Sequence, residues 1–214
     1  MPGGPAGNTF DKYHTTNPLY RALVGRFLAT VRTLAHSTGA RSVLEVGCGE
    51  GHLARYLTAD WDVPLFAAFD VSPVIVAQGA RLGGRPLFHV ADSYALPFPD
   101  ASFDLVLMCE VIEHLTRPEW ALAEVCRVAK RGCLLSVPRE PIWRFLNLAR
   151  GAYWRAWGNT PGHLQHWSRR GFLRLVESFG ELCTTASPFP WTVALISPRH
   201  PGHLPRPPRA PVTP

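Results

Sequence analysis

Residues 42–51 read Ser-Val-Leu-Glu-Val-Gly-Cys-Gly-Glu-Gly. The first five residues predict a short buried strand, and three glycines at alternate positions follow it. Glycine lacks a Cβ, so it permits a tight turn and lets the backbone approach a ligand closely. A helix predicted to begin at His52 would direct the positive end of its dipole at that ligand. The stretch therefore predicts a strand, a ligand-binding turn and a helix in succession.

Strands and helices alternate along the rest of the chain. Apolar runs predict strands at residues 42–46, 65–69, 87–90, 103–109, 133–137, 181–186 and 192–196. Helical spacing and capping residues predict helices at residues 19–36, 52–58, 119–129 and 169–179, and one that begins after Ser72. Continuous apolar strands that alternate with helices are typical of a doubly wound parallel sheet. We therefore predict an α/β fold with a mostly parallel seven-stranded sheet and an antiparallel C-terminal hairpin.

Composition limits the class of protein. With 214 residues and 46% hydrophobic composition, the chain suits one globular domain and not a disordered polymer. No apolar run reaches the roughly 18–20 residues that a membrane span needs, and the N-terminus does not resemble a secretory signal. Five scattered cysteines without a CxxC pair favour free thiols in a reducing cytoplasm. We expect a flexible lead at residues 1–9, one domain at 10–196 and a disordered proline-rich tail at 197–214.

Carboxylates stand at the ends of the predicted strands that follow the glycine turn. Asp70 ends the second strand, nineteen residues beyond Gly51, and a carboxylate there suits the two hydroxyls of a ribose. Asp92 and Glu110 end the next two strands. A dinucleotide-binding turn would need glycine at position 52, where this chain has His52. The pattern therefore favours a nucleoside cofactor without a pyrophosphate.

These motifs resemble those of the class I S-adenosylmethionine-dependent methyltransferases. Residues 45–51 are similar to their first motif, Asp70 to the end of the second, 91–93 to the third and 103–110 to the fourth. The stretch 96–104 resembles the branch that contains the ubiquinone and menaquinone pathway enzymes. The resemblance covers about residues 10–196 and implies a Rossmann-like fold and S-adenosylmethionine as cofactor. It implies cofactor contacts from Tyr13, Glu45, Gly47, Cys48, Gly49, Gly51, Asp70, Val71, Asp92, Ser93 and Glu110.

The segment after the fourth strand carries the candidate catalytic residues Glu110, Glu113 and His114. In a helical turn, positions i, i+3 and i+4 share one face, so these three side chains are expected to converge. The segment resembles the metal site of ubiquinone-pathway O-methyltransferases and of small-RNA terminal 2′-O-methyltransferases. That resemblance implies a divalent metal such as Mg²⁺ on these residues and His163, with His166 as a nearby spare. Two other roles stay open for His114, namely a metal-free base or substrate-orienting group, and a structural residue.

Residues 139–167 are expected to form a lid between the fifth strand and the next helix. The lid contains four tryptophans, and residues 139–174 carry seven arginines against one acid. Four interpretations stay open: a docked helix with solvated arginines, an aromatic wall for a flat or prenylated substrate, an interfacial helix at anionic lipid, and an RNA contact. Nucleic acid and peripheral membrane contact are therefore candidate partners beside a small molecule.

These motifs predict a methyltransferase that uses S-adenosylmethionine on an oxygen of a small aromatic or lipophilic metabolite. One alternative is an RNA 2′-O-methyltransferase with a divalent metal. The other is a non-catalytic interaction protein that binds the cofactor.

Overall fold

The computed structural model describes residues 17–149 and 153–199. The predictions for Tyr13, for the lead at 1–9 and for the tail from residue 200 onward fall outside these residues. None of the described helices is long and apolar enough to cross a bilayer.

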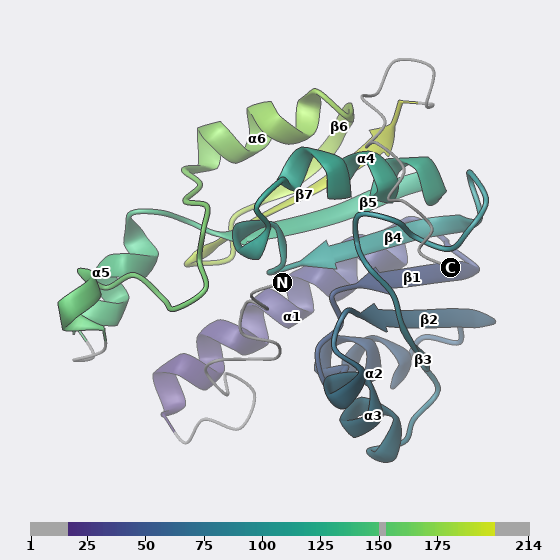
Figure 1. The fold of residues 1–214 in the computed structure, drawn as a ribbon, viewed down its shortest axis with the longest axis horizontal. Helices are drawn as coiled ribbons and strands as arrows, with labels where there is room; N and C mark the ends of the chain where they lie inside the picture. The colour runs from purple at the N-terminus through teal and green to yellow at the C-terminus, as the bar shows by residue number, and fades with distance from the viewer. Residues whose placement is uncertain (1–16, 150–152, 200–214) are drawn as a thin grey trace, which may run out of the picture.

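One seven-stranded sheet organises the molecule, with strand order β3-β2-β1-β4-β5-β7-β6 (Figure 1). The strands are β1 Ser42–Val46, β2 Leu65–Asp70, β3 Leu87–Val90, β4 Phe103–Cys109, β5 Ala129–Pro138, β6 Gly180–Ala186 and β7 Trp191–Pro198. Strands β1 to β5 run parallel, and β7 pairs antiparallel with both β5 and β6. The predicted fold class is therefore confirmed. Strand β7 extends two residues past the predicted domain boundary, because Ser197 and Pro198 pair with β6.

Helices cover both faces of the sheet (Figure 1). The helices are α1 Pro18–Ser37, α2 His52–Thr58, α3 Pro73–Arg81, α4 Pro118–Val128, α5 Ile142–Ala149 and α6 Arg169–Glu177, with short 3₁₀ turns η1 Ile112–His114 and η2 Trp154–Ala156. Apolar side chains of α1 and α2 pack on one face, and those of α4 and α6 pack on the other. Alternate residues of β4 join the two cores, since Leu105 and Leu107 face one and Val106 and Met108 face the other. This explains the continuous apolar run in the sequence.

Capping residues set where several helices begin. The side chain of Asn17 accepts hydrogen bonds from the backbone N–H groups of Leu19 and Tyr20, directly before Pro18. Ser72 caps α3 and Ser168 caps α6 in the same way. These side chains satisfy N–H groups that have no partner within the helix, which is why the predicted helix starts agree with the structure.

The strand order places a switch point between β1 and β4. The chain builds β1, β2 and β3 outward in one direction, then returns to place β4 on the other side of β1. In doubly wound sheets, ligands bind beyond the carboxyl ends of the strands at such a point. The glycine turn after β1 and the segment after β4 both begin there.

A partly buried ion pair holds the loop between β3 and β4. The Arg127 guanidinium donates to both carboxylate oxygens of Glu124 at 2.7 Å, and to the carbonyls of Leu96 and Phe98. Glu124 also accepts from the backbone N–H of Leu96. We expect Arg127→Ala to lower the free energy of unfolding by about 3 kcal/mol, because it leaves a buried carboxylate uncompensated. Urea unfolding measures the change, and Arg32→Ala, which removes an exposed pair with Asp60, should cost less than about 1 kcal/mol.

A second carboxylate ties the start of β1 to β4. Asp104 Oδ2 accepts hydrogen bonds from the backbone N–H of Arg41 at 2.9 Å and of Ser42 at 3.3 Å. Chiefly because of the bond from Arg41, the pKa of Asp104 lies below its ordinary value of 3.8. A carboxyl whose folded pKa is lowered contributes stability above its unfolded pKa and loses it as the pH falls through the folded pKa.

We therefore expect Asp104→Asn to have a lower free energy of unfolding than the parent at pH 7. This difference should shrink as the pH drops below about 4. Urea unfolding at neutral and acidic pH measures the difference in free energy of unfolding. An equal difference at both pH values would show that the charge of the carboxylate contributes nothing to stability. Asp62→Asn, at an exposed surface pair with Arg85, is the matched control and should change little.

Candidate functional site

The glycine turn between β1 and α2 adopts the backbone predicted for it. The backbone N–H groups of Gly47 and Cys48 both donate to the carbonyl of Phe69, at 2.7 and 2.8 Å. Gly47 has a φ of +74°, and a Cβ at this position would collide with a methyl group of Val111. Gly51 has a φ of +77°, and a Cβ there would collide with the ring of Phe88. Both positions need glycine for backbone and for space, so the turn can lie closely against the end of the sheet.

Asp70 links the glycine turn to the next turn of the chain. One carboxylate oxygen accepts from the backbone N–H of Gly49 at 3.0 Å, and the other accepts from that of Ser72 at 3.0 Å. A carboxylate can accept about four hydrogen bonds. Among the described residues, Asp70 therefore keeps acceptor positions that suit the hydroxyls of a ribose.

Glu45 on β1 and Cys48 within the turn are both buried. Burial, and after it the nearby Glu45 and Asp70 carboxylates, raise the pKa of the Cys48 thiol well above its ordinary value. The thiol is therefore neutral at physiological pH and fills space within the turn.

The remaining predicted cofactor contacts follow β2 and β3. Val71 is exposed directly after Asp70. Asp92 is exposed after β3 and accepts from the backbone N–H of Tyr94 at 2.9 Å, which shapes the turn that contains Ser93. These side chains lie at the carboxyl edge of neighbouring parallel strands, as the sequence predicts.

Glu110 does not take the position predicted for it. It has a φ of +61° and precedes η1, so no helical turn joins residues 110 and 114 and the predicted shared face is wrong. One carboxylate oxygen accepts from Trp191 Nε1 at 2.6 Å and the other accepts from the Ser136 hydroxyl at 3.2 Å. An indole N–H and a hydroxyl hold the carboxylate toward β5 and β7, because the left-handed backbone turns Glu110 away from the direction that a helix would give it.

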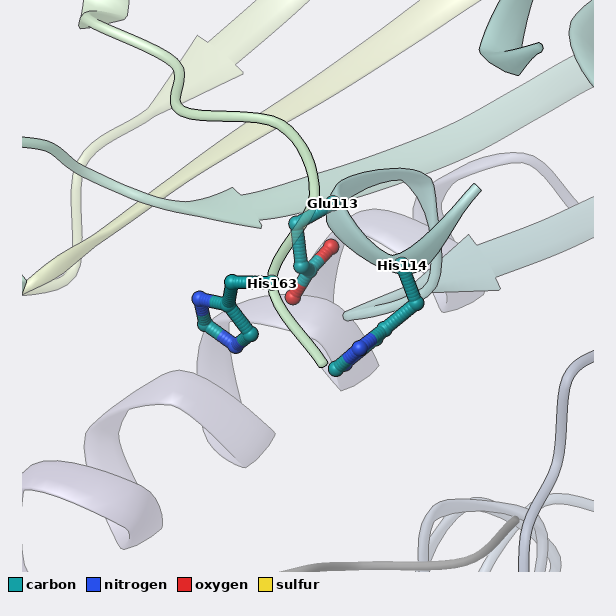
Figure 2. A group of neighbouring side chains, drawn as sticks. All are labelled: Glu113, His114 and His163. Atoms are coloured by element: carbon teal, nitrogen blue, oxygen red, sulfur yellow. The ribbon is translucent and has the colours of Figure 1, made fainter. Parts of the chain in front are cut away.

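Glu113, His114 and His163 form a cluster in which one ligand atom of each lies within 4.8 Å of the others. Figure 2 shows the three side chains converging from η1 and from residues 159–168, called the strap below. The backbone N–H groups of Leu164 and Gln165 donate to the carbonyl of Glu113 at 2.8 and 3.0 Å. These two bonds bring His163 to a site fifty residues earlier in the chain. Glu113 is buried at 1% exposure, so the carboxylate belongs to the protein interior.

The ring of His114 has a defined orientation. Its Nδ1 lies 2.9 Å from the carbonyl oxygen of Gly162. A carbonyl can only accept, so Nδ1 carries the hydrogen and the lone pair of the neutral ring is on Nε2. His114 can therefore act through Nε2, as a base or as a metal ligand.

Aromatic rings line the side of the cluster toward α1 and β7. Trp143 stacks near His163 with ring centres 6.4 Å apart, and Trp191 lies against both Trp143 and Phe27. No motif in the sequence marks Trp191 or Phe27 as a residue of the site. Trp191 directly precedes the strand predicted at residues 192–196. Its proximity to Glu110 depends on the register between β5 and β7, which a single sequence does not reveal.

The predicted spare ligand lies elsewhere. His166 Nδ1 is 3.6 Å from a carboxylate oxygen of Glu140, and His166 is not part of the cluster found among the described residues. The pKa of Glu140 is raised, chiefly by burial. The backbone N–H of Glu140 donates to the carbonyl of Trp167. Glu140 therefore holds the C-terminal end of the strap through both His166 and Trp167.

Comparison with known proteins identifies the family of the chain. A family described as a methyltransferase domain matches residues 44–137. A protein of Encephalitozoon cuniculi named "Putative methyltransferase" is 32% identical over 152 residues, which cover 66% of this chain and 67% of that protein. The demethylmenaquinone methyltransferase of a Parafrankia species is 31% identical over 167 residues, covering 66% of this chain and 64% of that one.

The fold also agrees with a solved structure. The magnesium protoporphyrin IX methyltransferase of Synechocystis, solved with bound S-adenosylhomocysteine, has a TM-score of 0.66 and 15% identity, covering 86% of this chain and 89% of that one. The matches with curated relatives span from 28% to 67% of those relatives' own lengths. With the strand order, the glycine turn and these matches together, the chain belongs to the class I S-adenosylmethionine-dependent methyltransferases.

Proposed function

We propose that the protein transfers the methyl group of S-adenosylmethionine to an oxygen of a small aromatic or lipophilic acceptor. The observation that carries this proposal is the cluster of Glu113, His114 and His163, which follows β4 at the switch point and is flanked by Trp143. The cofactor would lie over the glycine turn and Asp70. The acceptor would enter on the side of the strap and lie between the cofactor and the cluster.

Methyl transfer requires the protein to position the donor and the acceptor and to accept one proton. The positive charge of the sulfonium disappears as the methyl group moves in line to the acceptor, so no oxyanion has to be stabilised. The protein has to align the two groups and take a proton from a hydroxyl acceptor. His114 Nε2 is suited to accept that proton, because the bond from Nδ1 to Gly162 fixes the ring.

The donor set of the cluster also fits a divalent metal. One buried carboxylate and two imidazoles offer oxygen and nitrogen ligands. Such a mixture suits ions like Zn²⁺, Fe²⁺ or Mn²⁺ better than Mg²⁺, which prefers oxygen ligands. Glu113, His114 and His163 would hold the ion, and a bound ion would lower the pKa of an acceptor hydroxyl.

Metal removal distinguishes these two versions. If a metal is bound, dialysis against EDTA is expected to lower the rate of methyl transfer about tenfold or more, with recovery when Mn²⁺ is returned. His163→Ala should show the same loss and weaker Mn²⁺ binding by calorimetry, whereas His166→Ala should match the parent. A full rate after EDTA treatment and in His163→Ala would exclude the metal and leave the proton transfer to His114 alone.

Incubation with labelled S-adenosylmethionine and a fractionated cell extract tests the proposed function. The proposal expects label in an organic-soluble aromatic or lipid product, with the new methyl group on oxygen in the mass spectrum. Cofactor binding without label in any fraction would contradict it, and would favour an interaction protein.

RNA is the second candidate acceptor, and the position of His163 favours it. The strap that carries His163 is the segment whose sequence resembles small-RNA 2′-O-methyltransferases, and the structure brings His163 to Glu113 and His114. A short RNA with a terminal 2′-hydroxyl and its 2′-deoxy counterpart separate the candidates. Methylation of the first RNA alone, with binding that falls steeply with salt, would replace the small-molecule proposal.

A further inference from the structure

Three large aromatic side chains lie exposed on the segment between β5 and the strap. Phe145 on α5 is 67% exposed, Trp154 on η2 is 66% exposed and Trp157 directly after η2 is 78% exposed. Figure 1 shows α5 projecting at one end of the molecule, away from the helices that cover the sheet. We call α5 and the described residues 153–158 the α5–η2 unit. Exposed large apolar side chains that are this close in the chain suggest an interaction surface.

Hydrogen bonds hold the α5–η2 unit together on its inner side, where Trp143 also packs against Trp191. Asn147 is buried, and its side-chain amide donates to the carbonyl of Gly158 at 2.7 Å and to Thr160 Oγ1 at 3.0 Å. The guanidinium of Arg144 donates to the carbonyl of Trp157 at 3.1 Å. Hydrogen bonds therefore hold the unit together from inside, while aromatic rings face outward.

The backbone around the exposed rings is strained. Tyr153 and Trp157, which flank η2, have φ values of +57° and +52°. Residues with a Cβ rarely occupy this left-handed region, and such strain tends to accumulate at binding sites. The side chain of Trp157 lies largely in solvent. Packing of this side chain against the described residues therefore does not explain the unfavourable backbone.

The charge of this region indicates the chemistry of its partner. Residues 141–176 contain six arginines and no aspartate, glutamate or lysine. Arg170 and Arg174 of α6 are exposed. Tryptophan and phenylalanine among cationic side chains are characteristic of protein surfaces that lie at an anionic lipid interface.

We propose that the α5–η2 unit docks on an anionic phospholipid bilayer, with Phe145, Trp154 and Trp157 inserted at the level of the headgroups. The same unit adjoins the candidate active site, because Asn147 and Trp143 both donate to Thr160 at the start of the strap. Docking would place the entrance for a lipophilic acceptor against the bilayer. The docking does not depend on methyl transfer, so its test is independent of the proposed function.

Vesicle sedimentation of the full chain tests the proposal. Vesicles of phosphatidylcholine alone are compared with vesicles in which about a third of the lipid is phosphatidylglycerol. We expect binding to the anionic vesicles, and a loss of about tenfold or more in partitioning for Trp154→Ala/Trp157→Ala. The matched control is Leu82→Ala/Leu87→Ala, which removes two other exposed apolar side chains, at the end of α3 and the start of β3, and should bind like the parent. A thermal melt confirms that each variant is folded.

A second measurement needs no variant. Brominated lipids quench tryptophans that enter the bilayer, so quenching by anionic brominated vesicles is expected for the parent protein. Absence of vesicle binding, equal binding to neutral and anionic vesicles, or full binding by the Trp154/Trp157 variant would each overturn the proposal. So would a protein dimer or a single-stranded RNA complex that depends on these tryptophans in the absence of vesicle binding.

Discussion

Asp70→Ala is expected to weaken the affinity for S-adenosylmethionine about a hundredfold. The carboxylate accepts hydrogen bonds from the backbone N–H groups of Gly49 and Ser72 and, in our account, from the ribose hydroxyls. A hydrogen bond to a charged group contributes about 1.5–3 kcal/mol, so the loss of two of them, taken at the lower end of this range, gives a decrease of about a hundredfold. Isothermal titration calorimetry with S-adenosylmethionine and S-adenosylhomocysteine measures the affinity.

Two further variants support the interpretation of that result. Asp70→Asn keeps one acceptor oxygen, so its affinity should lie between those of the parent and Asp70→Ala. Asp62→Asn removes an exposed acid on the surface and should leave the affinity unchanged. If Asp70→Ala stays folded in a thermal melt and binds the cofactor like the parent, the ribose contact does not exist.

His114→Ala is expected to lower kcat about a hundredfold to ten-thousandfold, while the cofactor affinity changes little. A positioned proton acceptor contributes a factor of this size, and the expectation holds for His114 as base or as metal ligand. Single-turnover methyl transfer measures the chemical step, and calorimetry measures cofactor binding. A parent-like rate in His114→Ala would assign this side chain a structural role.

The matched control is His166→Ala. His166 is on the same strap as His163, but it pairs with Glu140 and lies outside the cluster. Its replacement should change kcat by less than about threefold, because it touches neither the cluster nor the reacting atoms. A large loss in this variant would show that the strap as a whole, and not the cluster, determines the rate.

The order and type of the elements could be predicted because each signal is local. Alternating apolar strands, helix caps and glycine positions follow from the nearest neighbours in the chain, and Gly47 and Gly51 need the conformations that their residue type suggests. Element ends were less accurate. Helix α4 ends at Val128 and β5 begins at Ala129, earlier than the predicted strand, because Ala129 pairs with Phe103 of β4.

The site was predicted in part, for a different physical reason. Glu113 and His114 are adjacent in the chain, so the same segment delivers both. His163 reaches them through two backbone bonds to Glu113, and only the resemblance to other proteins indicated it. The position of Glu110 depends on one left-handed backbone angle and on Trp191, which arrives from β7. Residue spacing encodes neither feature. Of the four predicted metal ligands, the structure therefore brings three together and leaves Glu110 out.

A crystal structure of the protein with S-adenosylhomocysteine tests the central claim most directly. Our account predicts the adenosine against the turn of Gly47–Gly51, with the ribose hydroxyls within hydrogen-bond distance of Asp70 and the sulfur directed toward His114. A nucleoside bound at another edge of the sheet, or a crevice at the end of β1 filled by side chains of the protein itself, would contradict it.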